Sequence, residues 1–288
     1  MLQDLLTQWQ VLGQASPFRL VDARLQVHWA AQVAASFAQT HVPAEPDFSH
    51  TSFEGRVDSG VFRFVTRPGP AGVRASLRVG DLTLELIDAG DRFVDRLHLH
   101  GRTLHEAYTW MADAVAGLTG DRTPLVRLEH DLPHHPVASS DPFTYNEIAE
   151  FEALERWFGN ADALLRHMRD THDPCRPIRS WPHHLDSAFL LVLDPDAGPE
   201  ATRSVGIGMS PGDRSYAQPY LYVNHWPRST SDRLSTLPVG RWHTTGWMGA
   251  VLTGDTLVAA GSAAAQVDLA LRFLDAAVEA SLRLLPED

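Results

Sequence analysis

Two groups of short, alternating apolar runs, each followed by a long amphipathic helix, constrain the fold of this chain more than any other feature. We expect the first group of strands at 61–65, 73–79, 82–87 and 93–99, with Gly, Pro and Asp turns between them. Such short connections join neighbouring antiparallel strands, because a parallel pair needs a crossover of about a dozen residues. The first group therefore predicts an antiparallel meander.

The second group repeats this order of elements. We expect strands at 185–193, 203–209, 220–226 and 241–257, and then a final helix with apolar residues at spacings of three and four. Strands that precede helices, instead of alternating with them, are typical of α+β proteins. We predict an α+β fold with two antiparallel β-sheet-containing halves and flanking helices, packed as one unit. The shared order of elements does not establish a duplication.

Helix signals stand out at three other places. Segment 16–41 is rich in Ala and begins with Ser-Pro, an N-cap residue followed by a first-turn proline. Alternation over residues 25–29 would also suit a strand, but the Ala content favours a helix. The motifs Thr103–Glu106 and Thr144–Glu147 have capping-box spacing, so we expect each of them to begin a helix.

The segment between the two halves is rich in Pro, His, Asp and Ser, which is typical of a connector. We therefore predict an N-terminal α+β half over residues 1–120 and a connector over 121–143. The C-terminal α+β half, over 144–288, then carries the candidate site.

Charge and length limit the classes of partner. The 24 basic residues are all Arg, they are scattered, and 36 acidic residues give a formal charge of −12. Nucleic-acid affinity depends on clustered cations, so we expect no nucleic-acid partner. With 288 residues, 44% of them hydrophobic, the chain can bury a core without a metal or a disulfide.

The expected compartment follows from three features. Cys175 is the only cysteine, residues 1–4 have no signal-peptide character, and the most apolar stretch, near 246–261, is too short and too polar to span a bilayer. We therefore expect a cytoplasmic protein with no membrane partner.

Several separate motifs occur in one order along nearly the whole chain. They are Asp47–Thr51, which contains SHT; Gly101–Thr103 with Trp110; WPHHLD at 181–186; SPGD at 210–213; PYLYV at 219–223; Trp226-Pro227; and WHTTGW at 242–247. With these motifs the chain resembles a bacterial family known only as a domain of unknown function. The resemblance implies no activity, cofactor or catalytic residue.

The first candidate site lies at the start of the expected strand 185–193. Side chains alternate along a strand, so His184 and Asp186 would share one face and His183 the other. A carboxylate beside an imidazole can fix the ring tautomer and support a general base or a metal ligand. The alternative is a polar pair at the strand entrance that serves only structure. As catalytic candidates we take His183, His184 and Asp186.

The 15 histidines raise the question of zinc, which needs three or four converging ligands. No compact zinc motif occurs, and the sequence does not identify a cofactor, which stays unknown. Should a metal bind, the best candidate ligands are His183, His184, Asp186 and His243.

Residues 208–212 match the G-x-S-x-G pattern of a hydrolase nucleophile elbow. The residue after the nucleophile normally donates an oxyanion-hole N–H, and Pro211 has none. We therefore predict that Ser210 is not a nucleophile and that Ser210 and Asp213, in a turn, hold backbone groups or face a pocket.

Aromatic residues complete the candidate site. On the expected strands, Tyr220 and Tyr222 share a face, as do His243 and Trp247, and flat apolar walls with polar tips are typical of small-molecule pockets. The ligand-binding candidates are His50, Thr51, Trp181, Asp213, Tyr220, Tyr222, His243 and Thr244. We also predict that His50 and Thr51 lie near the cluster of the second half.

These features predict a small-molecule-binding protein or an enzyme with a His, Asp and aromatic pocket. The alternative is a protein-protein interaction module without catalysis, which would use an aromatic strand face or the C-terminal helix to meet a partner or a second copy.

Overall fold

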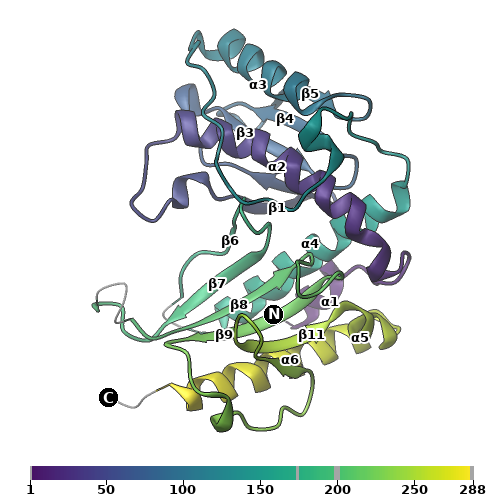
Figure 1. Cartoon of the computed structure of the whole chain (residues 1–288), viewed down its shortest axis with the longest axis vertical. Helices are drawn as coiled ribbons and strands as arrows, with labels where there is room; N and C mark the ends of the chain where they lie inside the picture. The colour runs from purple at the N-terminus through teal and green to yellow at the C-terminus, as the bar shows by residue number, and fades with distance from the viewer. Residues whose placement is uncertain (1, 173–174, 198–201, 286–288) are drawn as a thin grey trace. The chain divides into compact units, whose positions relative to one another are not determined.

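The computed structural model describes residues 2–172, 175–197 and 202–285 (Figure 1). It is an α+β structure with two antiparallel sheets, as predicted. Contacts divide the chain into two units. The meander unit comprises Arg19–Glu155 and Arg179–Leu185, and the terminal unit comprises Met1–Phe18, Arg156–Ile178 and Asp186–Asp288.

The meander unit contains a five-stranded sheet in the order β1-β2-β3-β4-β5. Its strands are β1 (Glu54–Asp58), β2 (Val61–Val65), β3 (Arg74–Arg78), β4 (Thr83–Ile87) and β5 (Phe93–His98), and every neighbouring pair is antiparallel. The predicted meander is therefore confirmed, with β1 as an additional strand that the sequence pattern had not indicated. A short strand, β6 (Arg179–Ser180), also belongs to this unit.

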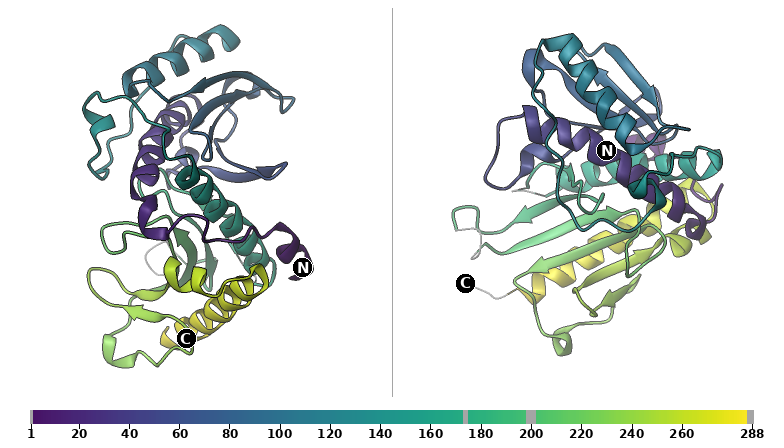
Figure 2. Two further views of the ribbon diagram at one scale, coloured as in Figure 1. Left: turned by 90° about the vertical axis from the view of Figure 1, so that its right-hand side faces the viewer. Right: turned by 45° about the horizontal axis from the view of Figure 1, so that its top comes forward.

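Alternation divides the meander sheet into an apolar and a polar face. Phe64, Leu77 and Leu84 stand opposite one another in the register and are fully buried. Helices α2 (Val21–His41) and α3 (Leu104–Thr119) lie on one side of this sheet (Figures 1 and 2). The other face carries Arg63 and Glu85, whose side chains form an ion pair with an N–O distance of 3.0 Å.

The helix starts in this unit match the sequence signals only in part. Short 3₁₀ turn η1 (Pro17–Leu20) leads into α2, and α3 begins with the predicted capping box between Thr103 and Glu106. The second predicted capping box is wrong, because helix α4 (Ile148–Asp170) begins only at Ile148. Thr144 instead exchanges two hydrogen bonds with the Gln26 side-chain amide.

The strands of the terminal unit run in the order β10-β11-β9-β8-β7. Their bounds are β7 (Ser187–Val192), β8 (Ser204–Ser210), β9 (Tyr220–Trp226), β10 (Arg241–His243) and β11 (Gly249–Thr253). The predicted single strand over 241–257 is wrong. A turn around Gly246, which has φ 81°, separates β10 from β11, and helix α5 (Gly254–Ala259) follows directly.

The final helix α6 (Ala263–Leu284) packs against β8, β9 and β11, and its apolar stripe is buried there. The N-terminal helix α1 (Leu2–Gln8) also contacts α6. The Gln266 side chain accepts from the Trp9 indole at 3.1 Å and from the Leu12 amide at 3.0 Å, and it donates to the Leu12 carbonyl. These bonds explain why residues 1–18 belong to this unit and not to the N-terminal half that was predicted for them.

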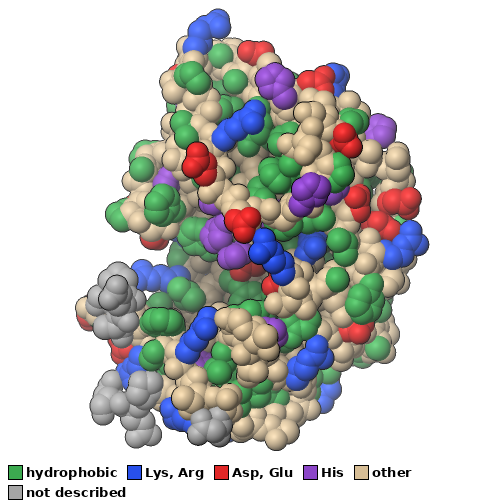
Figure 3. All heavy atoms as spheres, in the orientation of Figure 1, with side chains coloured by type: hydrophobic (Ala, Val, Ile, Leu, Met, Phe, Trp, Pro, Cys, Tyr) green, Lys and Arg blue, Asp and Glu red, His purple; other side chains and the backbone are tan. Residues whose placement is uncertain are grey.

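Two surface properties bear on partners. None of the helices in the described part of the chain is long and apolar enough to cross a membrane. On the face displayed in Figure 3, acidic and arginine side chains are interspersed, and neither sign forms a continuous patch. That face therefore points to no single class of charged partner.

Candidate functional site

Three strands of the terminal unit position a group of aromatic side chains. Tyr222 of β9 stands opposite Gly208 of β8 and Val251 of β11 in the register. A Cβ atom on Gly208 would lie 2.6 Å from the Tyr222 phenol, so this glycine provides the space in which the ring lies across the sheet. Because β9 alternates, Tyr220 and Tyr222 share a face, as predicted.

Five rings meet on this face, which we call the aromatic face. They belong to Tyr216, Tyr220, Tyr222, His243 and Trp247. The His243 and Trp247 ring centroids are 4.4 Å apart, and the Tyr220 ring is stacked on Trp247 at 6.1 Å. The Arg241 guanidinium lies over the Tyr216 ring at 5.5 Å. Contacts of this kind hold aromatic planes in a defined arrangement.

Two carboxylates accept hydrogen bonds from the tyrosine hydroxyls. Tyr222 donates to Asp186 at 2.5 Å, and Tyr220 donates to Asp213 at 2.8 Å. Asp213 also accepts from the backbone amides of Ser215 and Tyr216, so its position is fixed by the turn that carries it. The predicted role of Asp213 in holding backbone groups is confirmed.

The electrostatic environment keeps both tyrosines protonated. Burial raises the pKa of Tyr222 well above its ordinary value, and the negative charge of Asp186 raises it further. Burial and the Asp213 charge likewise raise the pKa of Tyr220. At neutral pH the two hydroxyls are therefore hydrogen-bond donors and not phenolate bases.

Both ring nitrogens of His243 are engaged. Its Nε2 lies 2.7 Å from the Thr245 carbonyl oxygen, and its Nδ1 lies 3.0 Å from the Tyr216 hydroxyl. A carbonyl can only accept, so Nε2 carries the hydrogen, and in the neutral ring Nδ1 accepts from Tyr216. The neighbouring Thr244 is exposed. His243 is thus a positioned ring of the aromatic face.

The strand geometry predicted for His184 and Asp186 is wrong. Residues 182–184 form a turn, Leu185 has a left-handed φ of 57°, and β7 begins only at Ser187. The alternation that would have placed the two side chains on one face therefore does not apply. Asp186 bonds to Tyr222, whereas the exposed His184 has its ring centroid 4.4 Å from that of His183.

His183 and His184 belong to a second group of rings, in the meander unit. We call His28, His130, His183 and His184 the histidine cluster. The His130 and His183 centroids are 5.4 Å apart, and Trp181 lies 5.9 Å from His183. His28 and Gln32, both on α2, hold the segment in place by donating to the Pro182 carbonyl oxygen at 2.8 and 2.7 Å.

Burial shifts the titration of this cluster. It lowers the pKa of His28 to about 4 and that of His183 to about 4, with a further contribution to His183 from the charges of His184 and His130. The pKa of His130 is lowered in the same way. All three rings are therefore neutral at pH 7.

The segment Ser49–Thr51 also lies in the meander unit, where it forms a single 3₁₀ turn. The next strand start is tied to β6, since Phe53 and Ser180 exchange two backbone hydrogen bonds of 2.8 and 2.9 Å. Arg179 donates to the Ser52 hydroxyl at 3.0 Å. His50 accepts a hydrogen bond from the Glu45 amide. The SHT motif at 49–51 therefore lies close to residues 179–180, which lead into the WPHHLD motif at 181–186.

The remaining predictions concern Ser210 and a metal site. Ser210 ends β8, its hydroxyl accepts from the Gly212 amide at 3.2 Å, and no helix follows, so the segment is a turn and lacks the helix of a nucleophile elbow. Across residues 2–172, 175–197 and 202–285, no group of three or more His, Cys, Asp or Glu side chains could hold a metal ion. The candidate set of His183, His184, Asp186 and His243 does not form one.

Sequence reasoning missed Tyr216, His28 and Gln32. Asp213 accepts from the Ser215 amide two residues on, as in an Asx turn, and from the Tyr216 amide, so this turn-forming residue was a usable signal for the place of Tyr216. His28 and Gln32 were one helical turn apart, which places two polar side chains on one face of a helix that is otherwise rich in Ala.

Comparisons of the chain with protein families, with characterised proteins and with solved structures give no match.

Proposed function

We propose that the aromatic face of the terminal unit binds a small planar molecule that is neutral or positively charged. The observation that supports this proposal is the pair of Tyr–Asp hydrogen bonds set within five packed rings. Stacking surfaces give affinity for a flat ligand, and a few polar groups at their edges fix its orientation. Asp186 and Asp213 supply negative charge, which favours a cation over an anion.

Recognition fits these groups better than proton transfer does. The tyrosines remain protonated at neutral pH, and both nitrogens of His243 are engaged. A general base is most effective with a pKa near the working pH, and the pKa of His183, about 4, makes its ring a weak base at pH 7. Catalysis by His183, His184 and Asp186 stays a prediction. A cytoplasmic location belongs to the proposal, because a single cysteine in 288 residues suits a reducing compartment.

Ligand-observed NMR with three probes of similar size tests the proposal. Benzamidine is planar and cationic, indole is planar and neutral, and benzoate is planar and anionic. We expect benzamidine and indole to bind and benzoate to bind at least about tenfold more weakly, because the carboxylates repel it. Equal binding of benzoate, or no binding of any probe, would contradict the proposal.

The matched variants are Trp247→Leu and Trp242→Leu. Trp247 contacts three rings of the aromatic face. Trp242 is also half-buried, but in the register it shares the opposite face with Val223, and its indole donates to the Ser235 carbonyl. We expect benzamidine binding to be lost in Trp247→Leu and kept in Trp242→Leu.

A second function, an interaction surface, is favoured by one observation. Leu190 and Trp226 are 45% and 48% exposed, and the alternation of β7 and β9 places them on the face that carries Tyr222. Sedimentation velocity of the intact chain tests this function. A concentration-dependent dimer that Trp226→Ser abolishes would support an interaction surface on this face. The predicted alternative surface, the C-terminal helix, is less favourable because the apolar stripe of α6 is buried.

A further inference from the structure

A pocket of about 370 Å³ lies on the meander unit, where β1, the loop after β2, the start of β3 and the turn between β4 and β5 meet. Its lining residues are Glu54, Arg56, Thr66, Arg67, Pro68, Gly72, Arg74, Ala89 and Asp91. Pockets of this volume accommodate small molecules. None of these residues takes part in the aromatic face.

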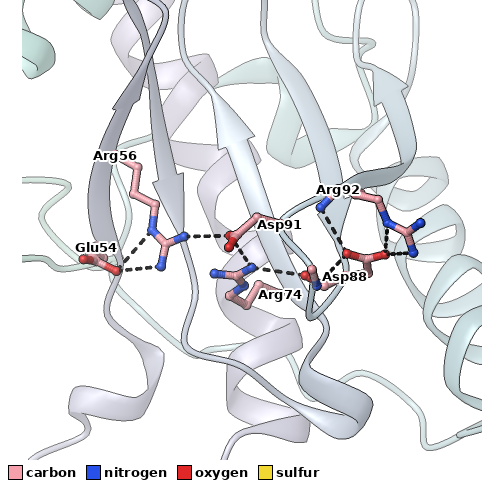
Figure 4. Close-up of polar contacts among 7 residues, drawn as sticks. Glu54, Arg56, Arg74, Asp88, Asp91 and Arg92 are labelled. Carbon is pink, nitrogen blue, oxygen red and sulfur yellow. Dashed lines mark hydrogen bonds and ion pairs between the residues drawn. The ribbon is translucent and has the colours of Figure 1, made fainter.

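Three arginines but only two carboxylates line the pocket. Arg56 donates to Glu54 at 3.1 Å and to Asp91 at 3.3 Å, and Arg74 donates to Asp91 at 2.7 Å (Figure 4). Arg67 is bonded outside the lining, to Glu45 at 3.2 Å. Among the lining residues the guanidiniums exceed the carboxylates by one, in a chain with a net charge of −12, and Glu45 outside the lining balances that charge.

Arg74 is the most constrained of the three. The residue is 9% exposed, and its Nε is buried with no hydrogen-bond partner in the part of the chain that the structure describes. Its Nη2 donates to the Asp88 carbonyl at 3.1 Å and to Asp91 at 2.7 Å, so the β4–β5 turn fixes the guanidinium at the pocket wall. A guanidinium held in place in this way loses little conformational entropy when an oxyanion binds to it.

Asp91 already occupies the position between two guanidiniums. It accepts from both Arg56 and Arg74, yet its side chain is 71% exposed and its backbone has a φ of 61°. The turn that carries it is held by Asp88, which accepts from the Gly90 and Arg92 amides and from the Arg92 side chain (Figure 4). The pocket thus contains a carboxylate of the chain itself, bound as an external carboxylate or phosphate group would be.

The floor of the pocket depends on a glycine. Gly72 has a φ of 74°, and a Cβ there would lie 2.8 Å from the Ala89 Cβ. Only glycine lets the loop after β2 approach the β4–β5 turn this closely. The approach brings Arg67 and Asp91, from the two segments, to one pocket.

We propose that this pocket binds the oxyanion of a small ligand, a phosphate or a carboxylate, between Arg56, Arg67 and Arg74, and that Asp91 competes for the same guanidinium groups. The planar forks of the arginines match both types of oxyanion. This site is separate from the proposed function, since it takes anions and uses none of the same residues.

Isothermal titration of the full chain at constant ionic strength tests the proposal with two probes, inorganic phosphate and succinate. We expect at least one of them to bind, and the stronger of the two identifies the ligand class. Arg67→Gln, at a side chain that is 45% exposed, should weaken binding about tenfold through the loss of one charge-assisted contact. The control Arg102→Gln changes another arginine of the meander unit, 53% exposed and paired with Glu106, that lies outside the pocket, and it should leave binding unchanged.

Asp91→Asn tests the competition. Removal of the internal carboxylate should strengthen binding of the same probe several-fold, while the circular dichroism spectrum confirms that the variant is folded. If neither probe binds, or if Arg67→Gln and Arg102→Gln weaken binding equally, the pocket is not an oxyanion site. If Asp91→Asn binds no more tightly than the parent chain, Asp91 is not a competitor.

Discussion

The two sheets bury one apolar face each, but their other faces are built from different chemistry. The meander sheet carries an ion-pair network in which Glu85, 1% exposed, meets Arg63 at 3.0 Å and Arg78 at 3.7 Å. The sheet of the terminal unit carries rings over glycines, with Tyr–Asp hydrogen bonds at their edges. Removal of one partner from a buried ion pair leaves an unpaired charge and costs much of the free energy of unfolding. Removal of one hydrogen-bonding group from packed rings costs less. The first face therefore suits a scaffold and the second a recognition surface.

The largest expected effect is on the meander face. Glu85→Gln leaves Arg63 and Arg78 without their shared carboxylate, and we expect the free energy of unfolding to fall by about 3–5 kcal/mol in urea denaturation. Glu54→Gln is the control, because the Glu54–Arg56 pair is exposed, and it should cost less than about 1 kcal/mol. Similar losses in the two variants would remove the distinction between buried and exposed pairs.

The second-largest expected effect is a loss of stability in acid, which the histidine cluster causes. The pKa of His28 is about 4 in the folded state and ordinary in the unfolded state, so the unfolded state binds more protons as the pH falls from 6.5 to 4. Stability is lost over this window, by about 3 kcal/mol from His28 alone. His28→Gln, which can keep the donor to Pro182, should flatten the dependence measured by urea unfolding at several pH values. His105→Gln, at an exposed histidine, is the control and should leave the pH dependence of the unfolding free energy unchanged.

On the aromatic face, Tyr222→Phe removes one hydroxyl from a charged acceptor. We expect a loss of about 1–3 kcal/mol, because hydrogen bonds to charged groups are stronger than neutral ones. Tyr145→Phe, in the meander unit, removes a hydroxyl from the neutral Gly80 carbonyl and should cost about 1 kcal/mol. A larger loss in Tyr145→Phe would reverse the ranking of the two contacts.

The smallest effects should come from exposed strand positions of the two sheets. Leu190 on β7 and Val57 on β1 are 45% and 48% exposed. Leu190→Thr and Val57→Thr should each change the thermal midpoint by an amount equivalent to less than about 0.5 kcal/mol. A clear rise or fall of the thermal midpoint in only one of the two variants would show that the strand surface carrying that residue does more than face solvent.

The fold was largely predictable because its strands carry clear turn signals. The runs at 61–65 and 220–226 coincide with β2 and β9, since each is rich in Val or aromatic residues and lies between Gly or Pro residues, at 60 and 68 for the first run and at 219 and 227 for the second. The predicted strand over 241–257 failed because Thr, Trp and Val continue the β-forming composition across a turn that only Gly246 signals.

The site was predictable only where it depends on local periodicity. Tyr220 and Tyr222 share a face because a strand alternates, and Asp213 holds a turn because of its type and position. The contact between Asp186 and Tyr222 joins residues 36 apart in the chain and had no sequence signal. The left-handed conformation of Leu185 had no sequence signal either, because leucine rarely adopts it.

The composition of the terminal unit has a consequence for synthesis on the ribosome. Its parts come from three stretches of chain, and the bond between Trp9 and Gln266 joins residues 257 apart. The meander unit can close as soon as residue 185 has emerged, whereas Leu5, Trp9 and Leu12 find their buried positions only after α6 has been made. Residues 5–12 are thus translated before the meander unit but reach their folded positions after it, and their apolar side chains stay unburied in the interval.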